Sequence, residues 1–228
     1  MKLKPGDPIA VLRRKPLRPA SLAGLRPLPS FGSLGCFVRY GGTVHLLTAA
    51  HVVARAVGGV VYAVLPDGSR VAIGVVATAA PHLDAALVAL HDTVGWDNGV
   101  AAGLSIKFIG NISDAEQPFK RGQATKLTRL ESFYEPRLDY VWPWRTSLTS
   151  GSGVLEIIRS AVARAFGQKV IVASFVAGRG PLPEKGDSGS VLVNDDGALV
   201  GLLVSGSGAI ALGVDIAEIQ RHFGFSLP

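Results

Sequence analysis

The pentapeptide Gly-Asp-Ser-Gly-Ser at residues 186–190 places a serine between two glycines, directly before an apolar run. Serine attacks a carbonyl carbon as a nucleophile when a neighbouring base removes its proton. The backbone N–H groups of Gly186 and Ser188 could stabilise the charge that develops on the carbonyl oxygen, because glycine leaves its N–H unobstructed. A Gly/Ser cluster beside an acidic residue is also typical of a simple turn, so this serine needs partners elsewhere in the chain.

Histidine is the natural base for a serine nucleophile at neutral pH. The chain has five histidines, namely His45, His51, His82, His91 and His222. His51 follows an apolar run that ends in two alanines, whose small side chains permit close packing around an imidazole. We therefore predict that His51 is the base; the alternative for any of the five is a surface histidine or a hydrogen-bonded core histidine.

A histidine that acts as the base needs a buried acceptor that holds its tautomer and stabilises the imidazolium. Asp84 fits this role, because it lies in the apolar run 83–90, where an unpaired carboxylate would carry a large burial cost. Asp67 and Asp97 are next to glycine or asparagine and are typical of turns, and Asp92 is a weaker competitor. We predict that Asp84 pairs with His51; the alternative is a strand-edge carboxylate that faces water.

Short apolar runs separated by Gly, Pro, Asn and Asp predict an all-β chain around these residues. The runs 35–40 and 43–50 flank Gly41-Gly42, a pair suited to a tight hairpin. Further strands are predicted at 60–66, 71–78 and 85–91. Together they form a first β-barrel over residues 31–112, which contains His51 and Asp84.

A second barrel is predicted over residues 113–228 and contains Ser188. Its candidate strands lie at 123–132, 140–144, 169–177, 189–194, 199–206 and 209–215. Two packed six-stranded antiparallel barrels are the expected architecture. The segment 153–168 fits a helix or a strand, with strand preferred. A short C-terminal helix is predicted from Ile216 to Phe223, where Ile216, Ile219 and Phe223 share one face.

A basic, proline-containing N-terminal arm is predicted over residues 1–30. Within residues 1–26 the chain has seven basic residues and one acidic residue, Asp7, which accounts for the net charge of +6. Such an arm is expected to be a solvated tail. Contact with nucleic acid or an anionic membrane through residues 1–26 is the minor alternative.

Composition limits the class of protein further. A chain of 228 residues with 48% apolar residues can bury the core of one domain or of two small ones. Cys36 is the single cysteine, so no internal disulfide can form and the fold must rest on packing and hydrogen bonds. The first residues lack the apolar stretch of a signal peptide, and no run reaches membrane-spanning length. We therefore expect a cytoplasmic protein.

The motifs LLTAAH (46–51), LDAAL (83–87) and GDSGS (186–190) resemble the three catalytic motifs of chymotrypsin/trypsin-like serine peptidases. The resemblance extends from about Ser33 to Phe223 and is closest in character to the disulfide-free bacterial members. The order His, Asp, Ser differs from that of subtilisins and α/β-hydrolases. The resemblance implies a serine endopeptidase that cleaves internal peptide bonds through a triad of His51, Asp84 and Ser188 and an acyl-enzyme intermediate.

The resemblance also implies a substrate pocket. Ser205, Gly206 and Ser207 would form one wall, Gly213 another, and Leu182, six residues before the nucleophile, the floor. An uncharged floor implies a preference for an apolar or small residue rather than Lys or Arg, because a buried cation needs an anionic partner. The alternative is that insertions within residues 178–185 shift the alignment.

The chain also departs from the secreted members of that family. Those are activated when a new N-terminus, beginning Ile-Val-Gly-Gly, pairs with the aspartate before the nucleophile, and this chain has no such sequence. If Asp187 is buried, it needs a cation or N–H donors that the sequence does not identify. No cofactor or metal is implied. The expected partners are a protein or peptide substrate and a regulatory protein; a catalytically silent binding module and an esterase using the same triad are the alternative functions.

Overall fold

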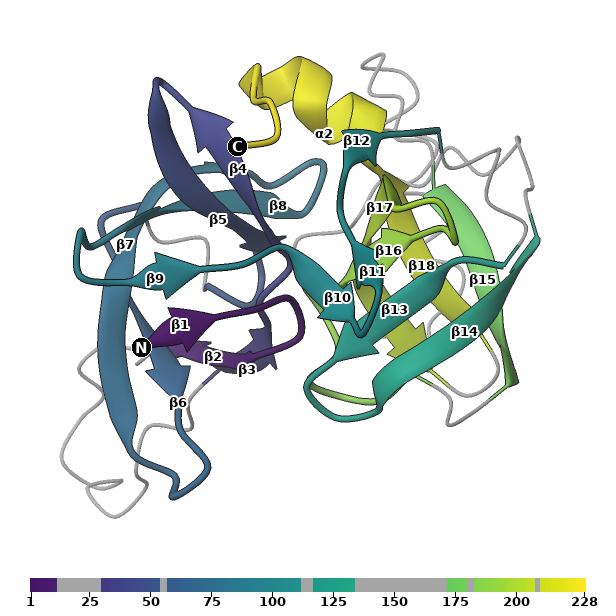
Figure 1. Ribbon diagram of the computed structural model, residues 1–228, viewed down its shortest axis with the longest axis horizontal. Helices are drawn as coiled ribbons and strands as arrows, with labels where there is room; N and C mark the ends of the chain where they lie inside the picture. Colours follow the sequence, from purple (N-terminus) through teal and green to yellow (C-terminus); the bar gives the residue numbers. More distant parts are fainter. Residues whose placement is uncertain (12–29, 54–56, 112–116, 134–171, 180–182, 208–209) are drawn as a thin grey trace, which may run out of the picture.

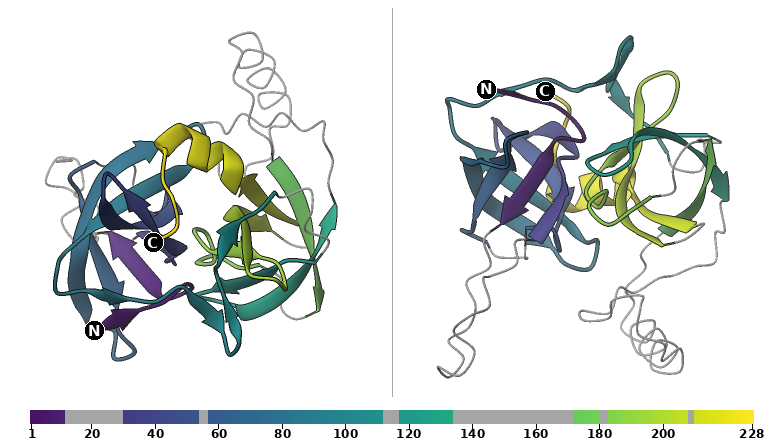
Figure 2. Two further views of the ribbon diagram at one scale, coloured as in Figure 1. Left: turned by 45° about the horizontal axis from the view of Figure 1, so that its top comes forward. Right: turned by 90° about the horizontal axis from the view of Figure 1, so that it is seen from below.

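The computed structural model describes residues 1–11, 30–53, 57–111, 117–133, 172–179, 183–207 and 210–228. In these ranges the chain forms two curled sheets that lie side by side, with the helix α2 at one end (Figures 1 and 2). The all-β architecture predicted from the sequence is confirmed.

The first sheet has the strand order β3-β2-β6-β7-β8-β5-β4, and all its pairings are antiparallel. Its strands are β2 (Pro8–Val11), β3 (Ser30–Ser33), β4 (Cys36–Tyr40), β5 (Thr43–Ala49), β6 (Val60–Val64), β7 (Arg70–Ala80) and β8 (Ala85–Leu90). Only Leu34 and Gly35 separate β3 from β4, and their N–H groups donate to Asp7 and Leu47 respectively. β3 and β4 are therefore one bent run that pairs with β2 on one side and with β5 on the other. Counted once, that run closes a six-stranded barrel.

The second sheet has the order β12-β17-β16-β13-β14-β15-β18, and a further pairing of β17 with β18 closes a ring of six strands. Its strands are β12 (Phe108–Ile109), β13 (Phe119–Gly122), β14 (Lys126–Phe133), β15 (Val172–Arg179), β16 (Val191–Val193), β17 (Ala198–Ser207) and β18 (Ile210–Asp215). β12 is a parallel addition to the first residues of β17. The predicted strand 140–144 and the ambiguous segment 153–168 lie outside the described residues.

Two short pairings complete the strands of the described ranges. β1 (Lys2–Leu3) pairs in parallel with β9 (Gly95–Trp96), and β10 (Gly99–Ala101) pairs with β11 (Leu104–Ser105). The hairpin between β4 and β5 turns at Gly41 and Gly42, whose φ angles of 55° and 83° are those that glycine adopts without steric cost.

The N-terminal boundary predicted from the sequence is wrong. Residues 8–11 are not part of a solvated arm, because β2 is a strand of the first barrel and pairs with both β3 and β6. Lys2 and Lys4 lie near Asp97, with Nζ to Oδ2 distances of 3.4 and 4.0 Å. The apolar strand Pro8–Val11 is too short to stand out beside basic neighbours, and its partners are distant in sequence. Residues 12–29 lie outside the described residues.

The boundary between the two barrels also differs from the predicted residue 112. Lys107 and Gly110 already donate to Gly197 and Leu199 of the second barrel, so the chain crosses before β12. A shared apolar core joins the barrels there. It includes Leu47 and Leu87 of the first barrel together with Leu199 and Leu202 of the second. A second core cluster fills the first barrel around Phe37, Leu46 and Ile73.

The helix α2 (Ile216–Phe223) has the predicted bounds. Its N-cap Asp215 accepts a hydrogen bond from the N–H of Ala217 (2.9 Å), and Gly224 ends it with φ 73°. Ile216 and Ile219 are buried in the shared core, so the helix packs against both barrels. Within the described part of the chain, no helix is long and apolar enough to span a membrane.

Candidate active site

His51 and Asp84 lie together in the first barrel. Strand β5 ends at Ala49, two residues before His51, and Asp84 directly precedes β8, which pairs with β5. Asp84 accepts two hydrogen bonds from the same residue: the backbone N–H of His51 donates to Oδ1 (2.9 Å), and Nδ1 of the ring lies 2.5 Å from Oδ2. An ionised carboxylate only accepts hydrogen bonds, so pairing with one would place the ring proton on Nδ1. The pairing of these two residues predicted from the sequence is present.

The backbone at Asp84 is held in an unusual conformation. Its φ angle is +46°, in the left-handed region, which costs about 1–3 kcal/mol for a residue other than glycine. Three contacts hold it there: the N–H of Ala50 donates to its carbonyl, its own N–H donates to Pro81, and its carboxylate binds His51. The side chain is buried, with a residue exposure of 1%. Strain of this kind persists where the surrounding structure imposes it, as it does here.

Ser188 lies against the first barrel, although it belongs to the second. The N–H of Ser33 donates to the carbonyl oxygen of Ser188 (2.8 Å). A Cβ placed on Gly32 would lie 2.9 Å from that same oxygen and would collide with the side chain of Val52, the residue after His51. Ser188 is therefore close to the segment that carries His51.

The hydroxyl of Ser188 has a backbone partner in this structure. Its Oγ donates to the carbonyl oxygen of Val204 at 3.3 Å, and no hydrogen bond joins it to His51. Hydrogen bonds of this kind are often long or unformed until a substrate is bound.

The loop 186–190 leaves two N–H groups available. Among the hydrogen bonds formed within the described ranges, none has the N–H of Gly186 or of Ser188 as its donor. The N–H groups between and after them are used: that of Asp187 donates to Glu184 (3.0 Å) and that of Gly189 donates to Leu203 (2.7 Å). Among the described residues, the N–H groups of the two predicted oxyanion donors thus have no acceptor, and both lie on one short loop.

Asp187 is buried and has a cationic partner, Lys120 of strand β13. Nζ of Lys120 lies 2.8 Å from Oδ2 of Asp187, and the whole of each residue is 0% exposed. The hydroxyl of Thr125 also donates to Oδ2 (2.6 Å), as does the N–H of Glu184 (3.0 Å). The N–H groups of Ala124 and Thr125 donate to Oδ1. This is the partner that the sequence left unnamed.

The ion pair decides the charge state of Asp187. Burial by itself raises the pKa of the carboxyl, but hydrogen bonds from Lys120 and Thr125 outweigh it, so the pKa of Asp187 lies below its ordinary value. Burial lowers the pKa of Lys120, and its hydrogen bond to Asp187 opposes that shift. Gly122 leaves room for the pair, because a Cβ there would collide with the carboxylate of Asp187.

Ser33 joins the two barrels at this loop and was missed by the sequence analysis. Its hydroxyl donates to the carbonyl of Gly186 (2.8 Å) and accepts from the N–H of Gln123 (2.8 Å). Its own carbonyl accepts from the hydroxyl of Thr48 (2.9 Å). Nothing in the sequence around Ser33 signals this role, because its partners lie in the second barrel. Lys120 was missed for the same reason.

The predicted pocket residues are only partly described. Ser205, Gly206 and Ser207 form the end of β17 and pair with β18, and Gly213 pairs with Leu203 of β17. Val204, which accepts the hydrogen bond from Ser188, directly precedes Ser205. The predicted wall therefore begins beside Ser188, although its role in binding stays a prediction. Leu182 lies outside the described residues.

No cluster of three or more His, Cys, Asp or Glu side chains is arranged to hold a metal within the described ranges. The thiol of Cys36 is buried, and burial raises its pKa far above the ordinary range, so it stays protonated.

Two closed six-stranded barrels with the GDSGS loop at their junction match solved serine proteases over the whole chain. Thermobifida fusca protease A has a TM-score of 0.64 at 15% identity, over 100% of this chain and 98% of its own. The Nocardiopsis protease has a TM-score of 0.64 at 14% identity, over 100% of this chain and 99% of its own. The Cellulomonas bogoriensis chymotrypsin has a TM-score of 0.60 at 16% identity, with the same coverage of both chains. The chain has the chymotrypsin-like fold. No protein-family model matches the sequence, and no curated protein does either.

The resemblance predicted from the three motifs is confirmed at the level of the chymotrypsin-like fold. The structural neighbours are bacterial chymotrypsin/trypsin-like serine proteases. At these identities the likeness concerns the fold, so the roles of individual residues rest on the geometry of this chain.

Proposed function

We propose that the chain is a serine endopeptidase in which Ser188 is the nucleophile, His51 the general base and then acid, and Asp84 the group that orients His51. The substrate is a protein or peptide, and no cofactor takes part. The observation that carries the proposal is the contact between His51 Nδ1 and the buried carboxylate of Asp84, on a segment next to Ser188. A proton on Nδ1 leaves the lone pair on Nε2, the nitrogen that would accept a proton from serine.

The reaction would proceed in two halves. Oγ of Ser188 attacks the carbonyl carbon of the scissile bond while His51 takes the hydroxyl proton. The N–H groups of Gly186 and Ser188 stabilise the oxyanion of the tetrahedral intermediate. His51 then gives the proton to the leaving amine, which breaks the C–N bond and leaves an acyl group on Ser188. In the second half, water attacks the carbonyl carbon of this ester while His51 takes a proton from the water. His51 then returns the proton to Oγ of Ser188, which releases the acyl group as a carboxylic acid and frees the enzyme.

The ion pair of Lys120 and Asp187 supports this proposal, because it anchors the residue between the two proposed oxyanion donors without any new N-terminus. The chain would therefore need no cleavage to form its oxyanion hole.

The preference for an apolar or small residue at the cleavage site follows only from the uncharged Leu182, and a peptide-library cleavage profile tests it. Cleavage mainly after Lys or Arg would contradict that preference.

Labelling with a fluorophosphonate probe tests the assignment. Wild-type protein should be labelled on Ser188 and should hydrolyse a peptide library. Ser188→Ala should abolish labelling and lower hydrolysis by at least about 10³-fold. Ser69→Ala, in an exposed turn of the first barrel, is the matched control and should leave both unchanged.

The bond from Ser188 to Val204 favours one competing function, a binding module that keeps the fold but does not turn its serine toward the base. Such a module would show neither labelling nor hydrolysis in the wild type. Undiminished hydrolysis by Ser188→Ala would refute the assignment of Ser188 as the nucleophile. Hydrolysis of esters but not of amides would identify an esterase instead.

A further inference from the structure

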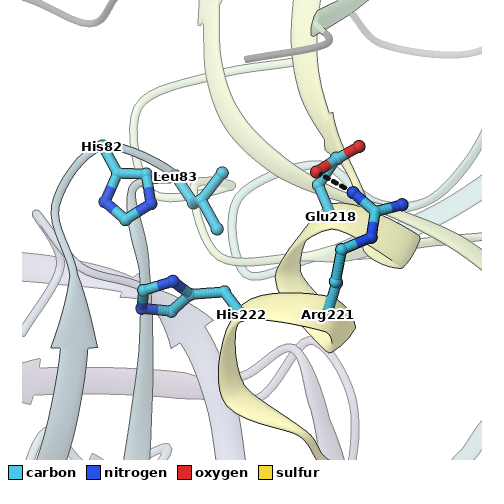
Figure 3. Close-up of a pocket in the computed structure, with 5 residues that line it drawn as sticks. All are labelled: His82, Leu83, Glu218, Arg221 and His222. Atoms are coloured by element: carbon cyan, nitrogen blue, oxygen red, sulfur yellow. Dashed lines mark hydrogen bonds and ion pairs between the residues drawn. The ribbon is translucent and has the colours of Figure 1, made fainter. Parts of the chain in front are cut away.

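His82 and His222 face each other where the first barrel meets the helix α2. Their ring centroids are 4.8 Å apart and their planes are inclined at 76°. Together with Leu83, Glu218 and Arg221 they line a pocket of about 300 Å³. Figure 3 shows the two imidazoles pointing toward one another, while Glu218 and Arg221 lie together along the helix.

Packing anchors the two elements that carry the imidazoles. Leu83, the neighbour of His82, is buried in the core shared by the two barrels, and so is Ile219, which precedes His222 by three residues on the same helix. The ring of His222 also contacts that of Phe223, with centroids 4.9 Å apart. The two rings therefore approach each other from separately anchored elements, which is the condition for a preorganised ligand pair.

Within the described part of the chain, the ring nitrogens of this pair have no competing hydrogen-bond partners. Neither imidazole forms a hydrogen bond with another residue of the described ranges; their contacts there are between rings. Neutral imidazole nitrogen is a preferred ligand of Zn²⁺, Ni²⁺ and Cu²⁺.

The charged neighbours do not block a cation. Glu218 and Arg221 are the charged groups that line the pocket, and they pair with each other (2.5 Å). The positive charge of Arg221 is thus offset, and Glu218 lies four residues before His222 on the helix. Residues at this spacing share one face of a helix.

We propose that His82 and His222 bind one divalent transition-metal ion, such as Zn²⁺, between the first barrel and the C-terminal helix, with water completing the coordination. The site is separate from the proposed triad and does not depend on it. An ion bound there links the loop 81–84, which leads to Asp84, to the helix that packs on both barrels. Metal binding therefore stabilises the contact between the barrels.

Isothermal titration of the untagged, metal-free full chain with Zn²⁺ tests this proposal, with the shift of the melting temperature as a second readout. Wild type should bind one ion and melt at a higher temperature with Zn²⁺ present. His82→Ala and His222→Ala should each lower the affinity by at least about tenfold and remove the shift. His91→Ala removes an exposed histidine of the first barrel, and both readouts should match wild type.

Two results would overturn the proposal. One is an affinity and a melting shift that neither His82→Ala nor His222→Ala changes, which would place the ion elsewhere, for example at His51. The other is a loss in only one of the two variants, since a shared ion requires both imidazoles. Because His222 is exposed near the end of the helix, His222→Ala is expected to fold, and the melting temperature without metal checks this directly.

Discussion

Replacing Lys120 with methionine should destabilise the protein by about 3 kcal/mol. Methionine is unbranched and adaptable enough to fill the space of the lysine stem, so the change mainly removes the positive charge beside Asp187. Removing one partner of a buried ion pair costs about 3–5 kcal/mol. The low end applies here, because the carboxylate keeps hydrogen bonds from Thr125, Ala124 and Glu184. For a chain of this size the loss corresponds to a fall in Tm of about 6–12 °C.

The same substitution should change the acid sensitivity of the fold. The pKa of Asp187 is depressed in the folded protein, so the stability it contributes is present above about pH 4 and is lost as the pH falls through its folded pKa. Without Lys120 that folded pKa rises. The acid unfolding midpoint of Lys120→Met should therefore move to higher pH.

Activity should fall as well, because Asp187 lies between the proposed oxyanion donors Gly186 and Ser188. We expect fluorophosphonate labelling of folded Lys120→Met to be slower by about 10²-fold, the effect of losing one oxyanion donor. Urea unfolding, thermal melting and labelling at 25 °C would measure the three effects. Lys107→Met, at an exposed position, should stay within about 0.5 kcal/mol of wild type. A loss of less than about 1 kcal/mol in Lys120→Met would refute the reasoning.

Two further substitutions test the neighbouring contacts. Asp84→Asn should keep the fold, because asparagine tolerates the left-handed backbone at this position. It should lower kcat by about 10⁴-fold with little change in KM, as measured by peptide hydrolysis kinetics. A kcat near wild type would exclude Asp84 as the orienting group. Ser33→Ala should lower the free energy of unfolding by about 1–3 kcal/mol, because the substitution leaves the N–H of Gln123 and the carbonyl of Gly186 unpaired. Urea unfolding measures this loss. An unchanged unfolding midpoint would contradict the bridging role of Ser33.

Local sequence was sufficient where neighbouring residues form an element. The helix Ile216–Phe223 was predicted with its bounds, and the strands of the Gly41-Gly42 hairpin to within one residue, because turn geometry, capping and the spacing of apolar residues act within a few positions. The pairing of His51 with Asp84 was also predicted, since a carboxylate in an apolar run needs a partner. The strand Pro8–Val11 was not, because a short strand is stabilised by its pairing with β3 and β6 rather than by its own composition.

The residues alone determined the all-β class, the order of the three motifs and the charge of each candidate side chain. Only the tertiary structure decided that Lys120 is the cation beside Asp187, 67 positions away, and that Ser33 holds Gly186, 153 positions away. A lysine or a serine is ordinarily a surface residue, and its own sequence neighbours do not show that it is buried. Closure of the barrels and their packing remove these polar groups from water, and burial then makes each hydrogen bond obligatory.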